Sequence, residues 1–164
     1  TVNVSTVTVG GISASFCGRQ VQTNVTAEIW QADVPTGTTA DVVVTWAGAT
    51  QGTLVGIYKV VGASGTAYSV QGQGLASATV LSVSIDCPAG GIIIGVAGME
   101  NATSSTRFTW AGLTERYDQD IDINSVGSGA GSAFATAQTA LTVSATAAAT
   151  FDTGVLLVCS FAPL

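Results

Sequence analysis

The sequence predicts an all-β protein: a single-domain antiparallel β-sandwich, jelly-roll-like, with about ten strands across residues 1–164. Three observations predict this fold. Valine, threonine and isoleucine dominate the extended stretches, and these residue types favour strands. Turn residues recur at short and regular intervals, as they do in sandwiches and barrels. No stretch sustains a 3.6-residue apolar period between helix caps, so a helical fold is not expected.

Individual strands follow from the local pattern. In TVNVSTVTV, valine alternates with polar residues, which gives a strand one apolar face and one polar face. The stretches DVVVTW and GIIIGVAG are continuous apolar runs, typical of central strands that are covered on both faces. The predicted strands are 2–9, 12–17, 26–31, 40–46, 53–61, 78–86, 92–97, 106–110, 141–145 and 155–161.

The segments between these strands carry turn and loop signals. Pro35 and Gly37 indicate a turn in DVPTGTTAD, and Pro88 ends a strand in DCPAGG. The stretch at 123–134 alternates glycine with small residues, which predicts a long exposed loop. The alanine-rich stretch at 130–150 is expected to be mostly strand and loop, with at most one short helical turn, because threonine and serine interrupt the alanines.

Charge is scarce and mostly negative. Only 9% of residues are charged, against about 25% in an ordinary soluble domain, and the formal net charge is −6. The four basic residues are scattered along the chain: Arg19, Lys59, Arg107 and Arg116. A protein that binds nucleic acid or an anionic membrane needs clustered basic side chains, so neither is expected as a partner. No apolar run reaches the length of a membrane-spanning helix.

The residues that usually carry catalysis are missing. The chain has no histidine, which removes Ser-His-Asp triads, Cys-His pairs and most zinc and iron sites. Paired carboxylates can hydrolyse glycosides, but such sites lie in aromatic-lined clefts and only 7% of this chain is aromatic. We therefore expect a protein that is not an enzyme and that has no organic cofactor.

The segment TERYDQDIDIN concentrates four of the ten acidic residues. Asp118, Asp120 and Asp122 have a spacing similar to that of a calcium loop, and this makes them a candidate Ca²⁺ site. Counted from Asp118, however, the sixth position is Ile123 and the twelfth is Gly129, where an EF-hand needs glycine and glutamate. The alternative is an edge strand whose charges deter pairing with another sheet. An acidic patch for a partner is a third interpretation.

Two tryptophans lie in a repeated motif, VTWAGAT at 44–50 and FTWAGLT at 108–114. Each motif is typical of a strand end that runs into a turn. Trp46 and Trp110 then either pack at the rim of the sandwich or stack on sugar rings as a ligand platform. Their alanine and glycine neighbours favour packing, since a sugar site needs side chains that bind hydroxyl groups.

Three cysteines, Cys17, Cys87 and Cys159, each lie at or near the end of an apolar stretch. They are too widely spaced for a zinc knuckle and are odd in number. Three interpretations remain open: buried small hydrophobic residues, one intrachain disulfide with a thiol left over, or a crosslink between subunits.

Three stretches resemble a known group of proteins. They are AEIWQADVPTGTTADVVVTWAGATQGTLVGIYKVVGAS, LSVSIDCPAGGIIIGVAG and FTWAGLTERYD. Their aromatic-x-Ala-Asp-Val-Pro-x-Gly stretch, valine-rich strand and Trp-x-x-Leu-Thr-Glu segment are similar to those of small β-rich, virion-associated proteins of tailed bacteriophages and prophages. The resemblance covers roughly residues 26–120, and the rest of the chain matches by composition.

This resemblance implies a structural protein on the virion surface, assembled in the host cytoplasm. The expected role is a capsid decoration (cement) protein that docks on the major capsid protein lattice and associates with copies of itself. One alternative is a tail-fibre or receptor-binding module whose tryptophans and 123–134 loop contact host glycans. Another is a secreted carbohydrate-binding or adhesion module.

Overall fold

The computed structural model describes residues 2–34, 37, 39–100 and 107–164. All regular structure in these ranges is β-strand, and they contain no helix capable of crossing a membrane. The all-β prediction is therefore confirmed, with eleven strands in the described ranges where about ten were expected. The strands are β1 (Val4–Val9), β2 (Ile12–Ser13), β3 (Ser15–Gln22), β4 (Val25–Gln31), β5 (Val42–Trp46), β6 (Ala63–Cys87), β7 (Ile92–Glu100), β8 (Phe108–Ala111), β9 (Glu115–Asp122), β10 (Ser125–Ala133) and β11 (Gln138–Pro163).

The strands form three antiparallel sheets. The main sheet has the order β6-β11-β7-β10-β9, and β8 also pairs with β11. β3 and β4 form a hairpin, and a third sheet has the order β2-β1-β5. This strand order is that of an antiparallel sandwich and does not establish the connectivity of a jelly roll.

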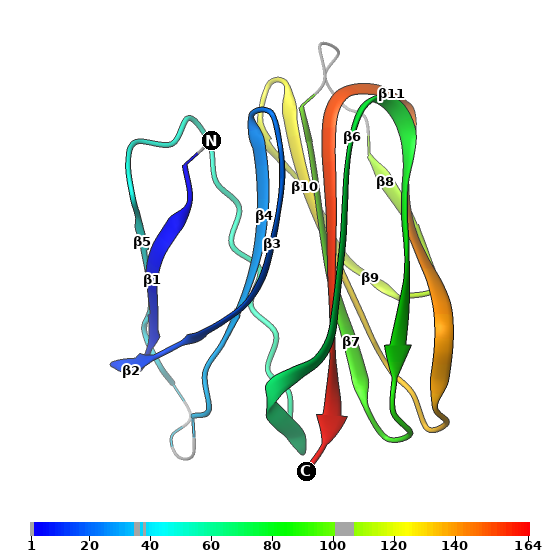
Figure 1. The fold of residues 1–164 in the computed structure, drawn as a ribbon. Helices are drawn as coiled ribbons and strands as arrows, with labels where there is room; N and C mark the ends of the chain where they lie inside the picture. The colour runs from blue at the N-terminus through cyan, green and yellow to red at the C-terminus, as the bar shows by residue number, and fades with distance from the viewer. Residues whose placement is uncertain (1, 35–36, 38, 101–106) are drawn as a thin grey trace.

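The two longest strands fold over together and turn the main sheet into two layers. β6 and β11 both rise, bend at the top of the molecule and descend again (Figure 1). At the bend the register between them shifts between Thr146 and Phe151, and Ser77 adopts a positive φ of 52°. The large layer contains residues 63–76 of β6 and 151–163 of β11, with β7, β10 and β9. The small layer contains residues 78–87 of β6 and 138–147 of β11, with β8.

The main core fills the space between these two layers. Leu81, Ile85 and Val143 of the small layer belong to the same buried cluster as Ile93 and Leu156 of the large layer. Phe151, at the bend, is wholly buried in that cluster. Full burial of such a side chain stabilises the fold by about 1.5–3 kcal/mol, so the bend is also an anchor of the core.

The β3-β4 hairpin and the segment 52–58 cover the outer face of the large layer. Ala27 of the β3-β4 hairpin packs with Val155 and Leu157 of β11 in a second buried cluster. Beside the hairpin, the segment 52–58 lies over β9 and β10, where Leu54 approaches Gly127 and Tyr58 approaches Gly131. Alternate residues of β11 therefore face two different cores. This explains the continuous apolar run in VLLVC at 155–159, since both faces of the strand are covered.

The β2-β1-β5 sheet lies beyond the hairpin, on the left of Figure 1. The Val4 backbone N–H donates to Glu28 Oε1 at 3.1 Å and joins this sheet to the hairpin. One face of the sheet, which includes Val42 and Val44, is half-buried, while Val43 on the other face is 54% exposed. The apolar run DVVVTW predicted a central strand covered on both faces, and this is wrong: β5 is an edge strand with one exposed face.

Two further sequence-based assignments are wrong. Residues 53–61 are not a strand: Leu54 and Tyr58 lie against β10, and the segment forms no ladder. Residues 123–134 are not an exposed loop, because 125–133 form β10, which pairs with β7 on one side and β9 on the other. The first half of β6 was not predicted at all. The predicted strand start at 106 and the predicted turn at Pro35 lie outside the described residues.

Candidate functional site

The acidic segment is the edge strand of the large layer. β9 lies at the end of the strand order, next to β10. Asp118 Oδ2 accepts the Phe108 backbone N–H of β8 at 3.0 Å, and the side chains of Arg107 and Asp120 form an ion pair at 2.9 Å. Asp122 Oδ1 accepts the Asn124 N–H at 2.8 Å and supports the β9-β10 turn. Each of the three aspartates therefore has its own structural partner.

This arrangement bears on the predicted calcium site. In the described ranges no group of three or more histidine, cysteine, aspartate or glutamate side chains is close enough to hold a metal ion. Asp118 Oδ1 is buried without a hydrogen-bond partner, and burial raises the pKa of this carboxyl above its usual value. The Ca²⁺ site at Asp118, Asp120 and Asp122 stays a prediction, and the geometry around these residues is that of a protected sheet edge.

Trp110 lies in the main core. Its side chain is 9% exposed, and its Nε1–H donates to the Ser128 hydroxyl of β10 at 2.8 Å. The same hydroxyl donates to the Tyr117 backbone carbonyl at 3.0 Å. The indole ring packs over Gly95, where an added Cβ would lie 2.9 Å from Cζ3 of the ring. A tryptophan held in this way packs the two layers together and presents no ring face to a ligand.

Trp46 has a different environment. It is half-buried at the end of β5, opposite Val4 of β1. In both repeats the strand ends near the tryptophan, as the motif predicted: β5 ends at Trp46, β8 ends at Ala111, and a bend follows each. The repeat is the same local device in two separate sheets, and the two indoles do not form one platform.

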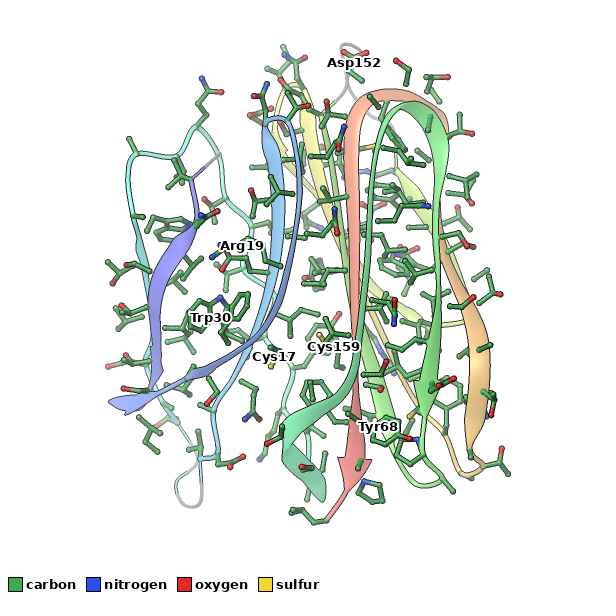
Figure 2. The ribbon with its side chains drawn as sticks, viewed as in Figure 1. Cys17, Arg19, Trp30, Tyr68, Asp152 and Cys159 are labelled. Atoms are coloured by element: carbon green, nitrogen blue, oxygen red, sulfur yellow. The ribbon has the colours of Figure 1, made fainter. Side chains whose placement is uncertain are left out.

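The three cysteines are free thiols on two faces of the large layer. Cys87 belongs to the main core between the layers. Cys159 alternates with Val158, which faces that core, and so points to the opposite side, toward the hairpin. A Cβ added at Gly18 of the hairpin would lie 3.9 Å from the Cys159 sulfur. Cys17, the neighbour of Gly18, lies at a bulge in β3 and is half-buried (Figure 2).

Burial governs the chemistry of these thiols. It raises the pKa of Cys17 to about 11 and that of Cys159 to about 12, and the pKa of Cys87 is raised as well. The thiolate is the reactive form, so all three are poor nucleophiles at neutral pH. Cys87 and Cys159 fit the interpretation as buried small hydrophobic residues, and Cys17 is the one with partial access to solvent.

A cluster that the sequence interpretation missed lies on the outer face of the hairpin, around Glu28. Glu28 Oε1 accepts the Arg19 Nε–H at 2.9 Å, and its Oε2 accepts the Trp30 Nε1–H at 2.8 Å. The Trp30 and Phe16 rings pack edge to face, with their centres 5.2 Å apart. The Arg19 guanidinium lies 5.4 Å from the centre of the Phe16 ring. The cluster depends on the hairpin register, which pairs Arg19 with Glu28. The predicted strand 12–17 ended before Arg19, so the sequence analysis could not find this pair.

A shallow hollow of about 390 Å³ lies beside the β1-β2 turn and is lined by Gly10, Thr39, Ala40 and Asp41. Its single carboxylate has no second titratable group beside it, so the hollow offers little to a reaction.

Comparisons of the chain with protein-family models, with curated proteins and with solved structures returned no match.

Proposed function

We propose that this chain is a structural protein of a phage virion: a capsid decoration (cement) protein that docks on the major capsid protein lattice. The proposal rests on the resemblance of residues 26–120 and on the use that the fold makes of those residues. A decoration protein needs a rigid body and a contact surface, and it needs no catalytic group.

The observation that carries the proposal is the placement of the segment 108–118, FTWAGLTERYD. Its polar groups make contacts within the fold: the Trp110 Nε1–H donates to the Ser128 hydroxyl and joins the two layers, and the Thr114 backbone N–H donates to the Ser132 hydroxyl at 2.9 Å. The guanidinium of Arg116 donates from Nε and Nη2 to the Gly131 carbonyl oxygen at 3.3 and 3.1 Å. Because the polar groups of this motif bond to other parts of the fold, the motif supports a structural role rather than catalysis or ligand binding.

Two further properties support a protein that docks in many copies. The surface carries few charges, so a modest contact involves little desolvation of ions. On an icosahedral lattice, a weak contact is repeated many times, and avidity then exceeds the affinity of one copy. The free thiols also suit assembly in a reducing cytoplasm.

The proposal is tested by deleting the gene from the phage and then adding the purified protein back to the particles. Particles from a phage lacking this gene are expected to lose heat resistance, and purified wild-type chain is expected to bind them to saturation and restore it. Deletion particles with unchanged stability and no saturable binding would refute the cement role.

The tail-fibre alternative now needs a different contact surface. Trp110 is buried and 125–133 is a covered strand, whereas Phe16 is 49% exposed and Tyr68 is 59% exposed. A Phe16→Ala variant that lost adsorption to host cells but kept capsid binding would favour the receptor-binding role.

A further inference from the structure

β6 forms a long free edge of the main sheet. It pairs with β11 along both of its halves, and no other described strand pairs with it. The strand runs for 25 residues, so one side of the sandwich is bordered by a single strand in both layers. An unpaired edge displays N–H and C=O groups that can template pairing with another strand.

Up to Ile85, this edge lacks the charged and proline residues that usually protect a free edge. Residues 60–85 contain no Asp, Glu, Lys or Arg. Exposed apolar side chains lie along the same stretch, among them Val61 at 85%, Tyr68 at 59% and Val80 at 41%. Proteins that keep an edge free place charges, prolines or short strands there.

The opposite edge of the same sheet shows the contrast. β9 has five charged side chains in eight residues, ERYDQDID. The neighbouring β8 edge is also capped, because the Asp118 carboxylate accepts the Phe108 N–H. The protein therefore places charged side chains along one edge and none along residues 60–85 of the other.

The second half of β6 has a regular ladder with β11. Its pairing is continuous from Ile85 with Leu141 to Val80 with Thr146, whereas in the first half Gln20 of the hairpin lies against Gly72 and Gly74. The Ser82 N–H donates to the Gln73 side chain at 2.7 Å, so this N–H points away from β11. Because alternate residues of an antiparallel strand share a direction, the N–H groups of Val80 and Ser84 also point outward.

We propose that residues 78–85 of β6 pair with the same segment of a second copy of this chain. The strands run antiparallel across a two-fold axis, which makes one surface complementary to itself. With the axis at Ser82, Val80 of one copy lies opposite Ser84 of the other, and about six backbone hydrogen bonds close the ladder. When the dimer forms, the backbone carbonyl of the second copy replaces the Gln73 side-chain oxygen as the acceptor of the Ser82 N–H.

The absence of charged side chains from this stretch allows a second copy as the occupant. Each molecule carries a net charge of −6, and two copies repel one another wherever their carboxylates meet. The 60–85 stretch is where copies can approach without bringing carboxylates of that stretch together. The proposal does not depend on a capsid role, since it concerns the isolated chain in solution.

The experiment measures the mass of the full chain by sedimentation velocity over a concentration series up to ~100 µM. The wild type is expected to shift from one chain of 16.3 kDa to a dimer. Val80→Glu with Ser84→Glu places carboxylates opposite one another and is expected to weaken the dimer by about tenfold or more. The matched control is Val43→Glu with Ile123→Glu, which adds the same charge at exposed apolar positions elsewhere and is expected to leave the dimer unchanged.

Ser84→Pro is a second variant that adds no charge. It removes an outward N–H without removing a bond to β11, and it is expected to weaken the dimer as the charged variant does. Hydrogen exchange of the wild type provides a readout that needs no variant: amides at 80, 82 and 84 should gain protection as concentration rises. A wild type that stays monomeric, or a dimer that is equally sensitive to the control variant, would overturn the proposal. A monomer that still binds capsids would leave the proposed function standing.

Discussion

Glu28 shows how one buried carboxylate joins three parts of the molecule. It accepts hydrogen bonds from Val4 of the outer sheet, Arg19 of β3 and Trp30 of β4. Its side chain is only 6% exposed. Hydrogen bonds to a charged group are worth about 1.5–3 kcal/mol each, so this residue contributes more than an ordinary surface ion pair.

Glu28→Gln should therefore destabilise the fold. The amide of the new side chain would point a donor at donors that now meet an oxygen, and we expect a loss of about 2–4 kcal/mol in the free energy of unfolding. Urea denaturation measures this loss. Glu115→Gln, the same change at an exposed position of β9, should cost less than about 0.5 kcal/mol, and equal losses would contradict the assigned role.

Asp118 gives the protein a pH dependence of known sign. Burial raises the pKa of its carboxyl above the usual 3.8, so the folded state takes up a proton at a higher pH than the unfolded state does. The charged form therefore opposes folding at neutral pH, and stability gained by protonation appears as the pH falls through the raised pKa. The wild type should gain stability relative to Asp118→Asn as the pH is lowered from 7 toward 4. Denaturation across this range checks it, and a flat or opposite difference would refute it.

At the scale of elements, glycines in β10 decide how the outer face is covered. The Tyr117 ring lies between Gly129 of β10 and Gly56 of the covering segment, and a Cβ at either glycine would overlap the ring. The glycines of 123–134 predicted a long exposed loop from the sequence. Their effect is the reverse, because they let a tyrosine lie flat on a central strand.

Gly129→Ala should thus destabilise the protein by about 1–3 kcal/mol through overpacking. The control is Gly48→Ala, where the nearest side-chain atoms would lie at an ordinary 3.8 Å and little change is expected. Thermal or urea unfolding of both variants gives the comparison. If Gly129→Ala were neutral, the close fit of Tyr117 would be wrong.

The bend in β6 makes a second prediction for an element. Ser77 has a φ of 52°, which costs a residue with a side chain about 1–2 kcal/mol relative to glycine. Ser77→Gly should stabilise the fold by up to about 1 kcal/mol. Ser144→Gly, in an extended part of β11, should destabilise it by about 0.5–1 kcal/mol. Unfolding midpoints that move in the same direction would contradict this account of the bend.

The sequence predicted the fold class well and the individual elements unevenly. Apolar alternation located β1, because burial on a sheet face imposes a period of two. Continuous apolar runs located β5 and β7, but β5 is an edge strand with one exposed face, whereas its run predicted a central strand covered on both faces. Neither pattern located the first half of β6, where glycine, serine and glutamine pack under the hairpin: Gln20 of β3 approaches Gly72 and Gly74. The sequence also predicted a strand at 53–61. A segment that packs over a sheet carries apolar side chains as a strand does, although its backbone pairs with no strand.

The candidate site was predictable only in part. The edge position of the aspartates and the strand-end position of the tryptophans both followed from local pattern. The Glu28 cluster did not, because cross-strand pairs depend on a hairpin register that no single strand reveals.

At the scale of the whole molecule, the described polar groups largely serve the fold. Carboxylates cap backbone N–H groups or pair with arginines, and the buried tryptophan bonds a serine hydroxyl. A rigid, layered body with one charged edge and one uncharged edge is suited to repeated docking on a larger assembly. This view of the molecule leads to the capsid proposal and locates the surface for self-association on β6.

The most direct test of the capsid role is immunogold labelling of purified particles from the phage that encodes this chain. An antibody against the folded protein should label the head densely and at high copy number. Label confined to the tail tip would contradict the decoration role and favour receptor binding. No label on any particle would contradict a virion protein altogether.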